Sequence, residues 1–148
     1  MAEPRLSYVI GRLDHAVRRH LSEHLKELGV TLPEYTALSV LRRGGELSNA
    51  QLSRRVLVTP QSAIKVVSAL ERKGLIERQP DPDHGRILRA RITKKGGAVL
   101  DACDLAADEM EAQMLEGMSA KEREQLSRAL KSCLNGLGAG LSAERSRV

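Results

Sequence analysis

The sequence predicts a mainly helical fold that carries one small β-hairpin. Leucine-rich apolar stripes recur at helical spacing along most of the 148 residues, and Gly or Pro stands where these stripes begin and end. A stretch of alternating residues beside a turn cluster interrupts them, which is typical of a hairpin. The chain has no Trp or Phe and two Tyr, so Leu, Val, Ile and Ala must form its core, which suits packed helices.

Two helices are predicted in the N-terminal part of the chain. The first covers residues 6–28, where apolar residues step by three and four until Gly29. The second covers residues 34–43, with Pro33 at its start and Gly44–Gly45 at its end. Each helix therefore carries one apolar side that needs a packing partner.

A closely spaced pair of helices follows. Residues 48–51 fit a capping box that opens a short helix to about residue 56. After a turn at residues 57–58, Thr59 and Pro60 open a second helix that ends near residue 73, before Gly74. A short helix, a tight turn and a second helix have the spacing of a helix-turn-helix motif.

The second helix of this pair is amphipathic. At about 100° per residue, its apolar side comprises Ala63, Ile64, Val67 and Leu70. The other side offers hydrogen-bonding groups separated by small residues, namely Gln61, Ser62, Lys65, Ser68, Ala69 and Arg72. Such a face can contact base edges and phosphates in a major groove. An ordinary surface helix is the alternative interpretation of this helix taken alone.

A β-hairpin is predicted next. Strands over residues 75–79 and 86–92 flank a turn cluster at residues 80–85. Its tip holds His84, Gly85 and Arg86. A hairpin directly after a helix-turn-helix is a wing, whose Gly can approach a sugar-phosphate backbone and whose Arg can enter a minor groove. Asp81 and Asp83 would repel phosphate unless they orient an arginine, so a solvated loop is the alternative.

Two more helices complete the chain. Thr93 caps a long one that ends near Met118, although Gly96 and Gly97 weaken its first turn. A second capping box, at residues 119–122, opens the last helix. We expect residues 142–148 to form a frayed tail.

Positive charge is concentrated in the middle of the chain. Residues 42–95 contain 13 Lys and Arg against 5 Asp and Glu, a net charge of +8, whereas the whole chain carries +5 and its two flanks together −3. A basic central segment between acidic flanks is typical of a nucleic-acid-binding surface that is held by flanking segments of a different character. A merely basic protein is the alternative. The scarcity of aromatic residues argues against binding of single strands by base stacking.

The sequence resembles the MarR family of winged helix-turn-helix regulators over nearly its whole length, most clearly in residues 30–96. The run Leu-Glu-x-x-Gly-Leu-x-x-Arg stands at residues 70–78, and Asp81, Pro82 and Arg86 match the wing pattern Asp-Pro-x-Asp-Arg-Arg. His84 and Gly85 replace the second Asp and the first Arg of that pattern. This leaves open whether the Asp–Arg pair that braces the family's wing forms here, and His84 suggests wing contacts sensitive to mild acid.

The resemblance implies a sequence-specific regulator of transcription, a repressor that binds a pseudo-palindromic operator in double-stranded DNA as a homodimer. The implied organisation is an N-terminal dimerisation helix in residues 1–31, a DNA-binding lobe in residues 32–93, C-terminal dimerisation helices in residues 94–141 and a tail in residues 142–148. The residues expected to contact DNA are Ser48, Asn49, Gln51, Thr59, Gln61, Ser62, Lys65, Ser68, Arg72, His84 and Arg86.

The resemblance also implies release by a small aromatic or phenolic effector. Arg12, His15 and Tyr35 are candidates to line a crevice for it, and ordinary surface or core positions are the alternative for all three.

Other functions have less support in the sequence. His20 and His24 stand at metal-binding spacing, but no downstream His completes a site, so we expect no metal or other cofactor. Cys103 and Cys133 lie on helix stripes, where Cys usually acts as a small hydrophobic residue. An enzyme is disfavoured because no Gly-rich phosphate loop or nucleophile elbow is present. A winged helix used for protein contacts remains the third hypothesis.

The expected location is the cytoplasm. No apolar stretch approaches the roughly 18 residues of a membrane helix. The N-terminal residues carry Asp14 and several Arg within the apolar pattern, which is unlike a signal peptide.

Overall fold

The structure is a computed structural model and describes residues 2–56 and 58–140. Its contacts divide the chain into two compact units, Met1–Met110 and Glu111–Val148. The predicted tail at residues 142–148, and Leu57 of the predicted turn, lie outside the described residues.

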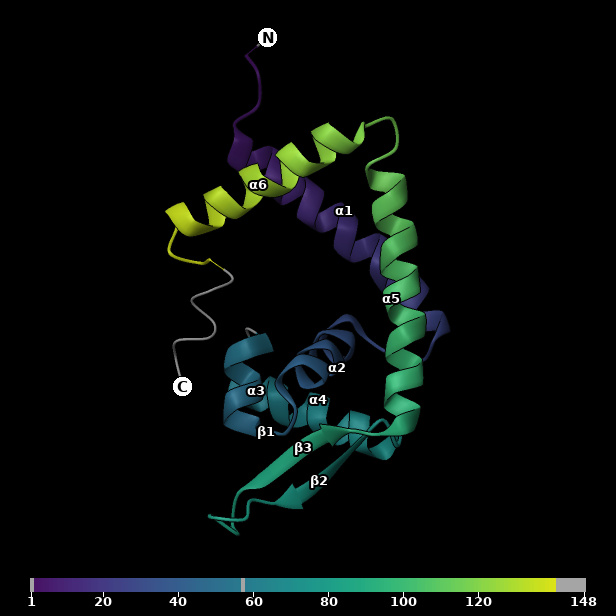
Figure 1. Cartoon of the computed structure of the whole chain (residues 1–148), viewed down its shortest axis with the longest axis vertical. Helices are drawn as coiled ribbons and strands as arrows, with labels where there is room; N and C mark the ends of the chain where they lie inside the picture. Colours follow the sequence, from purple (N-terminus) through teal and green to yellow (C-terminus); the bar gives the residue numbers. More distant parts are fainter. Residues whose placement is uncertain (1, 57, 141–148) are drawn as a thin grey trace. The chain divides into compact units, whose positions relative to one another are not determined.

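The described residues form helices and a small sheet in the predicted order (Figure 1). The helices are α1 (Leu6–Glu27), α2 (Leu32–Gly44), α3 (Asn49–Val56), α4 (Pro60–Arg72), α5 (Lys94–Met114) and α6 (Ala120–Gly136). The strands are β1 (Leu47–Ser48), β2 (Ile76–Pro80) and β3 (Leu88–Ile92). The predicted fold class, mainly α with a β-hairpin wing, is confirmed.

Side-chain caps determine where several helices begin. The Ser48 hydroxyl accepts a hydrogen bond from the Gln51 N–H (3.3 Å), and the Gln51 side chain accepts one from the Ser48 N–H (3.0 Å), as the capping box predicts. Ser119 and Glu122 form the same reciprocal pair at the start of α6. A third capping box, of Thr31 and Glu34, was not predicted. It starts α2 at Leu32, so that Pro33 lies within the first turn.

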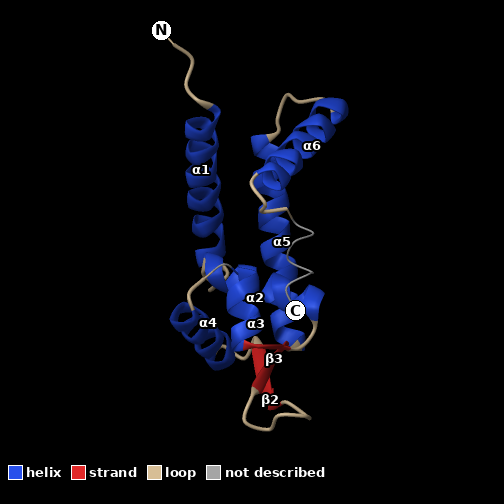
Figure 2. Ribbon diagram, turned by 90° about the vertical axis from the view of Figure 1, so that its left-hand side faces the viewer, coloured by secondary structure: helices blue, strands red, loops and turns tan. Residues whose placement is uncertain are grey.

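The sheet is antiparallel with the order β1-β3-β2, and β2 and β3 form the wing (Figure 2). Ile76 of β2 lies opposite Ile92 of β3, and Pro80 lies opposite Leu88. The prediction missed β1, which pairs Leu47 with Ala90. The second wing strand begins at Leu88 rather than at residue 86, because the preceding residue, Ile87, closes the wing loop through bonds with the His84 carbonyl and the Asp81 N–H.

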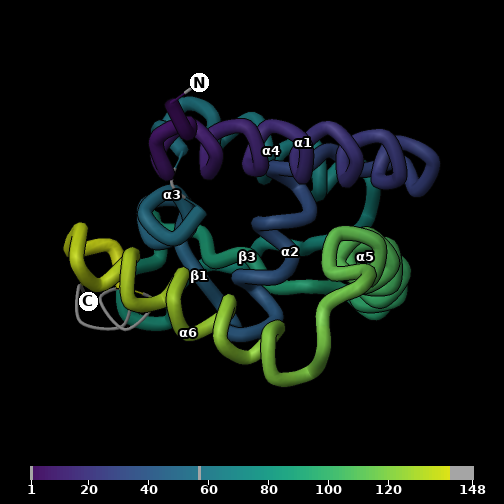
Figure 3. The backbone as a smooth tube through the Cα atoms, turned by 90° about the horizontal axis from the view of Figure 1, so that it is seen from above, coloured from purple at the N-terminus to yellow at the C-terminus, as the bar shows by residue number. Residues whose placement is uncertain are grey.

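Aliphatic side chains from five helices and the sheet form the core of the first unit. The largest fully buried ones are Leu25, Leu38, Leu41, Leu52, Leu70 and Leu100. A fully buried leucine contributes about 1.5–3 kcal/mol to folding, so this cluster holds the short helices α2, α3 and α4 in place. Figure 3 shows α1 as one continuous helix. Its buried residues are Leu21 and Leu25, whereas the rest of its predicted stripe is largely exposed in this chain.

Helix α5 ends earlier than predicted, at Met114 instead of near Met118. Gly117 adopts φ +82°, a left-handed conformation that glycine tolerates and that terminates helices. The Arg123 guanidinium donates hydrogen bonds to the carbonyl oxygens of Leu115 (3.1 Å) and Met118 (3.0 Å). These bonds satisfy carbonyl groups left without helical partners in the connection to α6.

Among the helices of residues 2–56 and 58–140, none has the length and apolar character needed to cross a membrane.

Candidate nucleic-acid interface

Helix α4 presents the polar face that its sequence predicts. The Thr59 hydroxyl caps its start by accepting a hydrogen bond from the Ser62 N–H (3.1 Å). Ala63, Val67 and Leu70 are buried against the core. Of the predicted contact residues on the other side, Gln61, Ser62, Lys65 and Arg72 are exposed and Ser68 is half-buried.

The prediction for Ile64 was wrong. Its side chain is 52% exposed instead of facing the core. At about 100° per residue, Ile64 lies about 100° from Ala63, outside the narrow arc of Ala63, Val67 and Leu70. Val66 packs against the core cluster at the other edge of that arc. The α4 surface is therefore polar with one isoleucine at its border.

Two of the three predicted contact residues at the start of α3 already have structural roles. Ser48 and Gln51 cap α3 through each other's backbone, and both are half-buried. Asn49 is also half-buried. Any contact of Ser48 or Gln51 with DNA must therefore use hydrogen-bonding capacity that remains beside the cap.

A buried carboxylate organises the wing. Asp81 is 5% exposed and accepts hydrogen bonds from the backbone N–H groups of Asp83 (2.8 Å) and His84 (3.1 Å). It also forms an ion pair with Arg89 of β3. The Asp83 N–H foremost, together with Arg89 and the His84 N–H, holds the pKa of Asp81 below its ordinary value. An Asp–Arg pair therefore does brace this wing, and it holds the loop that exposes His84 and Arg86.

Ion pairs divide the cations of the basic block, residues 42–95, into two groups. Five of its cations are engaged: Arg42 by Asp101 and Asp104, Lys73 by Glu34, Arg78 by Glu71, Arg89 by Asp81, and Arg91 by Glu46 and Glu77. The others have no carboxylate partner among the residues that the structure describes, and they are Arg43, Arg54, Arg55, Lys65, Arg72, Arg86, Lys94 and Lys95. Lys65, Arg72 and Arg86, the cations predicted to contact DNA, all belong to this second group.

Within residues 2–56 and 58–140, no hydrogen bond or ion pair joins the candidate effector residues Arg12, His15 and Tyr35 to one another. The Tyr35 hydroxyl donates a hydrogen bond to Asp104 of α5 (2.8 Å), and burial together with this carboxylate raises the pKa of Tyr35. Arg42 binds Asp101 and Asp104 from the same side of α2. Tyr35 thus belongs to a polar link between α2 and α5. Arg12 and His15 are exposed on α1.

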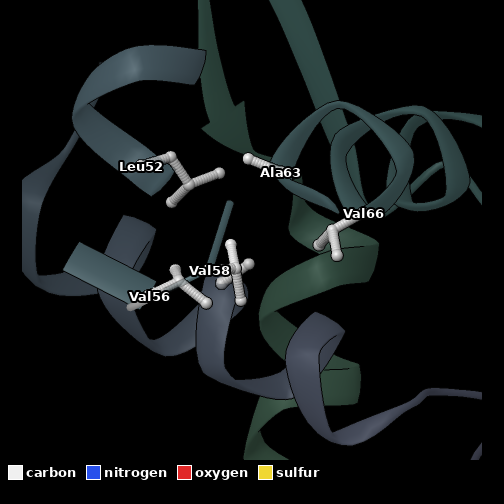
Figure 4. Close-up of a pocket in the computed structure, with 6 residues that line it drawn as sticks. Leu52, Val56, Val58, Ala63 and Val66 are labelled. Atoms are coloured by element: carbon white, nitrogen blue, oxygen red, sulfur yellow. The ribbon is translucent and has the colours of Figure 1, made fainter. Parts of the chain in front are cut away.

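One small hydrophobic cavity lies among α2, α3 and α4 (Figure 4). Its lining residues are Ala37, Leu52, Val56, Val58, Ala63 and Val66. It is too narrow for a water molecule and none of the candidate effector residues lines it. We interpret it as a packing gap rather than a ligand site.

The residues considered for metal binding and redox chemistry lie on α1, α5 and α6. No group of three His, Cys, Asp or Glu among residues 2–56 and 58–140 could hold a metal ion. His24 Nδ1 lies 2.8 Å from the His20 carbonyl oxygen. Cys103 is buried as predicted, and burial raises the pKa of its thiol to about 11. Cys133 is exposed, contrary to the prediction, because no residue of α6 is buried within this chain.

Comparison with known proteins identifies the family. The model of the MarR family matches residues 28–87. The HTH-type transcriptional repressor Rv2887 of Mycobacterium tuberculosis is 32% identical over 126 residues, which cover 85% of this chain and 91% of that protein. The chain belongs to the MarR family.

Solved structures agree with this assignment. Rv2887 in complex with DNA superposes with a TM-score of 0.77 at 28% identity, covering 88% of this chain and 98% of that one. RdhR-CbdbA1625, an organohalide-sensing regulator in its 2,4-dichlorophenol-bound form, has a TM-score of 0.74 at 25% identity, with 88% and 78% covered. Apo MarR of E. coli shares the fold, with a TM-score of 0.81 at 22% identity and 90% and 99% covered.

Membership of the MarR family decides between the broad functional classes. MarR proteins are DNA-binding regulators of transcription, so this chain is a regulator and not an enzyme. Within this MarR chain, α3 and α4 form the helix-turn-helix and β2 and β3 form the wing.

Proposed function

We propose that this MarR-family chain represses transcription by binding a pseudo-palindromic operator in double-stranded DNA as a homodimer. The observation that carries the proposal is the exposed face of α4, which presents Gln61, Ser62 and Lys65 beside a wing that exposes Arg86. Within the described part of the chain, neither Lys65 nor Arg86 is paired with a carboxylate. Rv2887, which is named a repressor and has been solved with DNA, supports it.

The chemistry of these side chains suits the two grooves. The amide of Gln61 can pair with an adenine edge, and Lys65 can donate to guanine or to a phosphate. The capped start of α4 presents backbone N–H groups and a partial positive charge that favour phosphate. Arg86 at the wing tip suits the narrower minor groove. His84 at the same tip, and Thr59, Ser68 and Arg72 of α4, are proposed as supporting contacts.

Unpartnered apolar residues support the homodimer. In the first half of α1, the exposed apolar residues are Leu6, Tyr8, Val9, Ile10 and Leu13. Helix α6 has no buried residue within the chain, and the side chains of Leu130 and Leu134, with that of Leu137 directly after the helix, are exposed. Exposed leucines at this density normally mark an interface. We therefore keep residues 1–31 and 94–141 as the proposed dimerisation segments, and residues 32–93 as the DNA-binding lobe.

A phenolic effector is the last part of the proposal. RdhR-CbdbA1625 has been solved with 2,4-dichlorophenol, and the match to it covers 88% of this chain. Arg12 and His15 on α1, with Tyr35 on α2, remain the proposed contacts. Binding there would act on α2 through the Tyr35–Asp104 bond. Release of DNA on addition of 2,4-dichlorophenol tests this part.

The proposed function is tested by DNA binding of the purified chain. A duplex operator is first selected from a random library with the wild-type protein, and its affinity is then measured against a scrambled duplex over a salt series. We expect two protomers per duplex, preference for the selected sequence and an affinity that falls steeply with salt. Equal affinity for both duplexes would contradict sequence-specific repression, and absence of binding at low salt would favour the protein-contact hypothesis.

Single substitutions in α4 and the wing separate base contacts from phosphate contacts. Lys65→Ala is expected to cost about 1–3 kcal/mol of binding free energy and to relax specificity at one position. Arg86→Ala is expected to weaken binding to all sequences. It should also make the plot of log affinity against log salt concentration less steep, by about 1 for each protomer bound. Arg91→Ala is the matched control, because Glu77 and Glu46 already engage that guanidinium. A salt slope that responds equally to Arg86→Ala and Arg91→Ala would contradict this division of the basic block.

A further inference from the structure

The exposed isoleucine of α4 has no evident role in the fold. Ile64 is 52% exposed, whereas its neighbours Ala63 and Val67 are 1% and 0% exposed. An isoleucine left in water at this level contributes little hydrophobic stabilisation, and its β-branch slightly disfavours a helix. A polar residue or alanine would serve the fold at least as well at this position. The side chain is therefore available for a contact outside the chain.

The surroundings of Ile64 are those of the DNA-reading face. Gln61 precedes it by three residues and Ser68 follows it by four, so all three stand in one row along the helix. Lys65 is adjacent in sequence and exposed. A single apolar side chain among polar ones is too small a patch for a protein interface, which needs a contiguous apolar surface. A small apolar group surrounded by hydrogen-bonding groups matches this pattern better.

The major groove of DNA contains one such group. Each base pair there presents hydrogen-bond donors and acceptors, and thymine alone adds a methyl group at C5. Gln61, in the same row, has the side chain that pairs best with adenine. We propose that Ile64 contacts the C5-methyl group of a thymine and thereby contributes to operator selection. This inference rests on the proposed function, because it requires α4 to lie in the major groove.

The test removes the methyl group from the DNA and the isoleucine from the protein in turn. The probe is the duplex selected with the wild-type chain, in which each thymine is replaced by deoxyuridine at the equivalent place in both half-sites. Wild type, Ile64→Ala and the control Arg86→Ala are compared on the thymine and deoxyuridine duplexes. Because Ile64 is exposed, Ile64→Ala should fold normally, and thermal unfolding of both variants checks this.

We expect one thymine per half-site at which loss of the methyl group lowers wild-type affinity by about fourfold, the factor that corresponds to one buried methyl or methylene group. Ile64→Ala should bind both duplexes of that pair equally. Arg86→Ala should bind both more weakly and keep the fourfold ratio.

Three results would overturn the inference while leaving the proposed function intact. In the first, the wild-type chain binds its selected duplex specifically, but no thymine-to-deoxyuridine change lowers its affinity. In the second, the affinity difference between the thymine and deoxyuridine duplexes persists in Ile64→Ala. In the third, Arg86→Ala also abolishes that difference. A wild-type chain that selects no sequence at all would overturn both proposals together.

Discussion

Replacing Gly96 by alanine is expected to lower the free energy of unfolding by about 3 kcal/mol, as overpacking of a tight site does. A Cβ atom at Gly96 would lie 2.0 Å from the carbonyl oxygen of Leu75 and 2.9 Å from Cγ1 of Ile92. The Ile92 side chain can rotate away, but the Leu75 carbonyl is backbone and already accepts a hydrogen bond from the Thr93 N–H (3.0 Å). Relief would require α5 to move away from the backbone of Leu75, which directly precedes β2.

Gly97→Ala is the matched control in the same helical turn. A Cβ atom there would meet only the Arg42 guanidinium, at 3.7 Å. The substitution should therefore raise stability by up to about 1 kcal/mol, because alanine is the better helix former. Urea unfolding of the two variants measures the difference. Equal midpoints would mean that α5 does not begin in close contact with the backbone of Leu75.

Replacing Asp81 by alanine is expected to weaken operator binding by about tenfold, similar to the loss of one well-placed arginine contact. This direction is opposite to that of simple electrostatics, because removal of a negative charge near DNA should strengthen binding. The reason is that Asp81 holds the wing loop through two backbone N–H groups and Arg89. Without it, the loop that positions Arg86 loses its organising contacts, and Arg89 loses its partner.

Asp83→Ala provides the control of opposite sign. Asp83 is exposed, and it contributes to the loop through its backbone N–H, which donates to Asp81 and which alanine retains. Its removal should leave the wing intact and strengthen DNA binding slightly. If Asp81→Ala and Asp83→Ala both strengthened binding, the brace would have no function in DNA recognition.

The pH dependence of the brace follows from the pKa of Asp81. Because this pKa is lower in the folded chain than the ordinary value near 4, the brace is fully formed above that ordinary value. Its stabilisation is lost as the pH falls through the lowered pKa. The brace should therefore make no contribution to any change of DNA affinity with pH near neutrality, which DNA-binding measurements of wild type and Asp81→Ala over that range would check.

Local sequence signals were sufficient for most of the secondary structure. The capping box of Ser48 and Gln51 and the start of α4 at Thr59 and Pro60 were predicted correctly, because these signals act within four residues. The polar face of α4 followed from helical periodicity alone. Ile64 was assigned to the wrong side because it lies at the edge of the apolar arc, where the extent of the neighbouring surface decides burial.

Contacts between distant residues could not be predicted in this way. The two residues of β1 are too few to show any periodicity, and they become a strand only because β3 lies beside them. Asp81 and Arg89 meet because the hairpin folds back, and Tyr35 meets Asp104 across 69 positions of sequence. The two glycines at the start of α5 look alike in sequence, but Gly96 faces the Leu75 carbonyl and Gly97 does not.

The sequence by itself determined the order of helices and hairpin, the helix starts, the basic centre and the motifs of the MarR family, since each of these depends on residue type and short-range spacing. Only the tertiary structure decided which cations are neutralised, which aspartate braces the wing and which apolar side chain of α4 is left exposed. Those properties depend on distances between elements far apart in the chain, and these distances arise only when the core has packed.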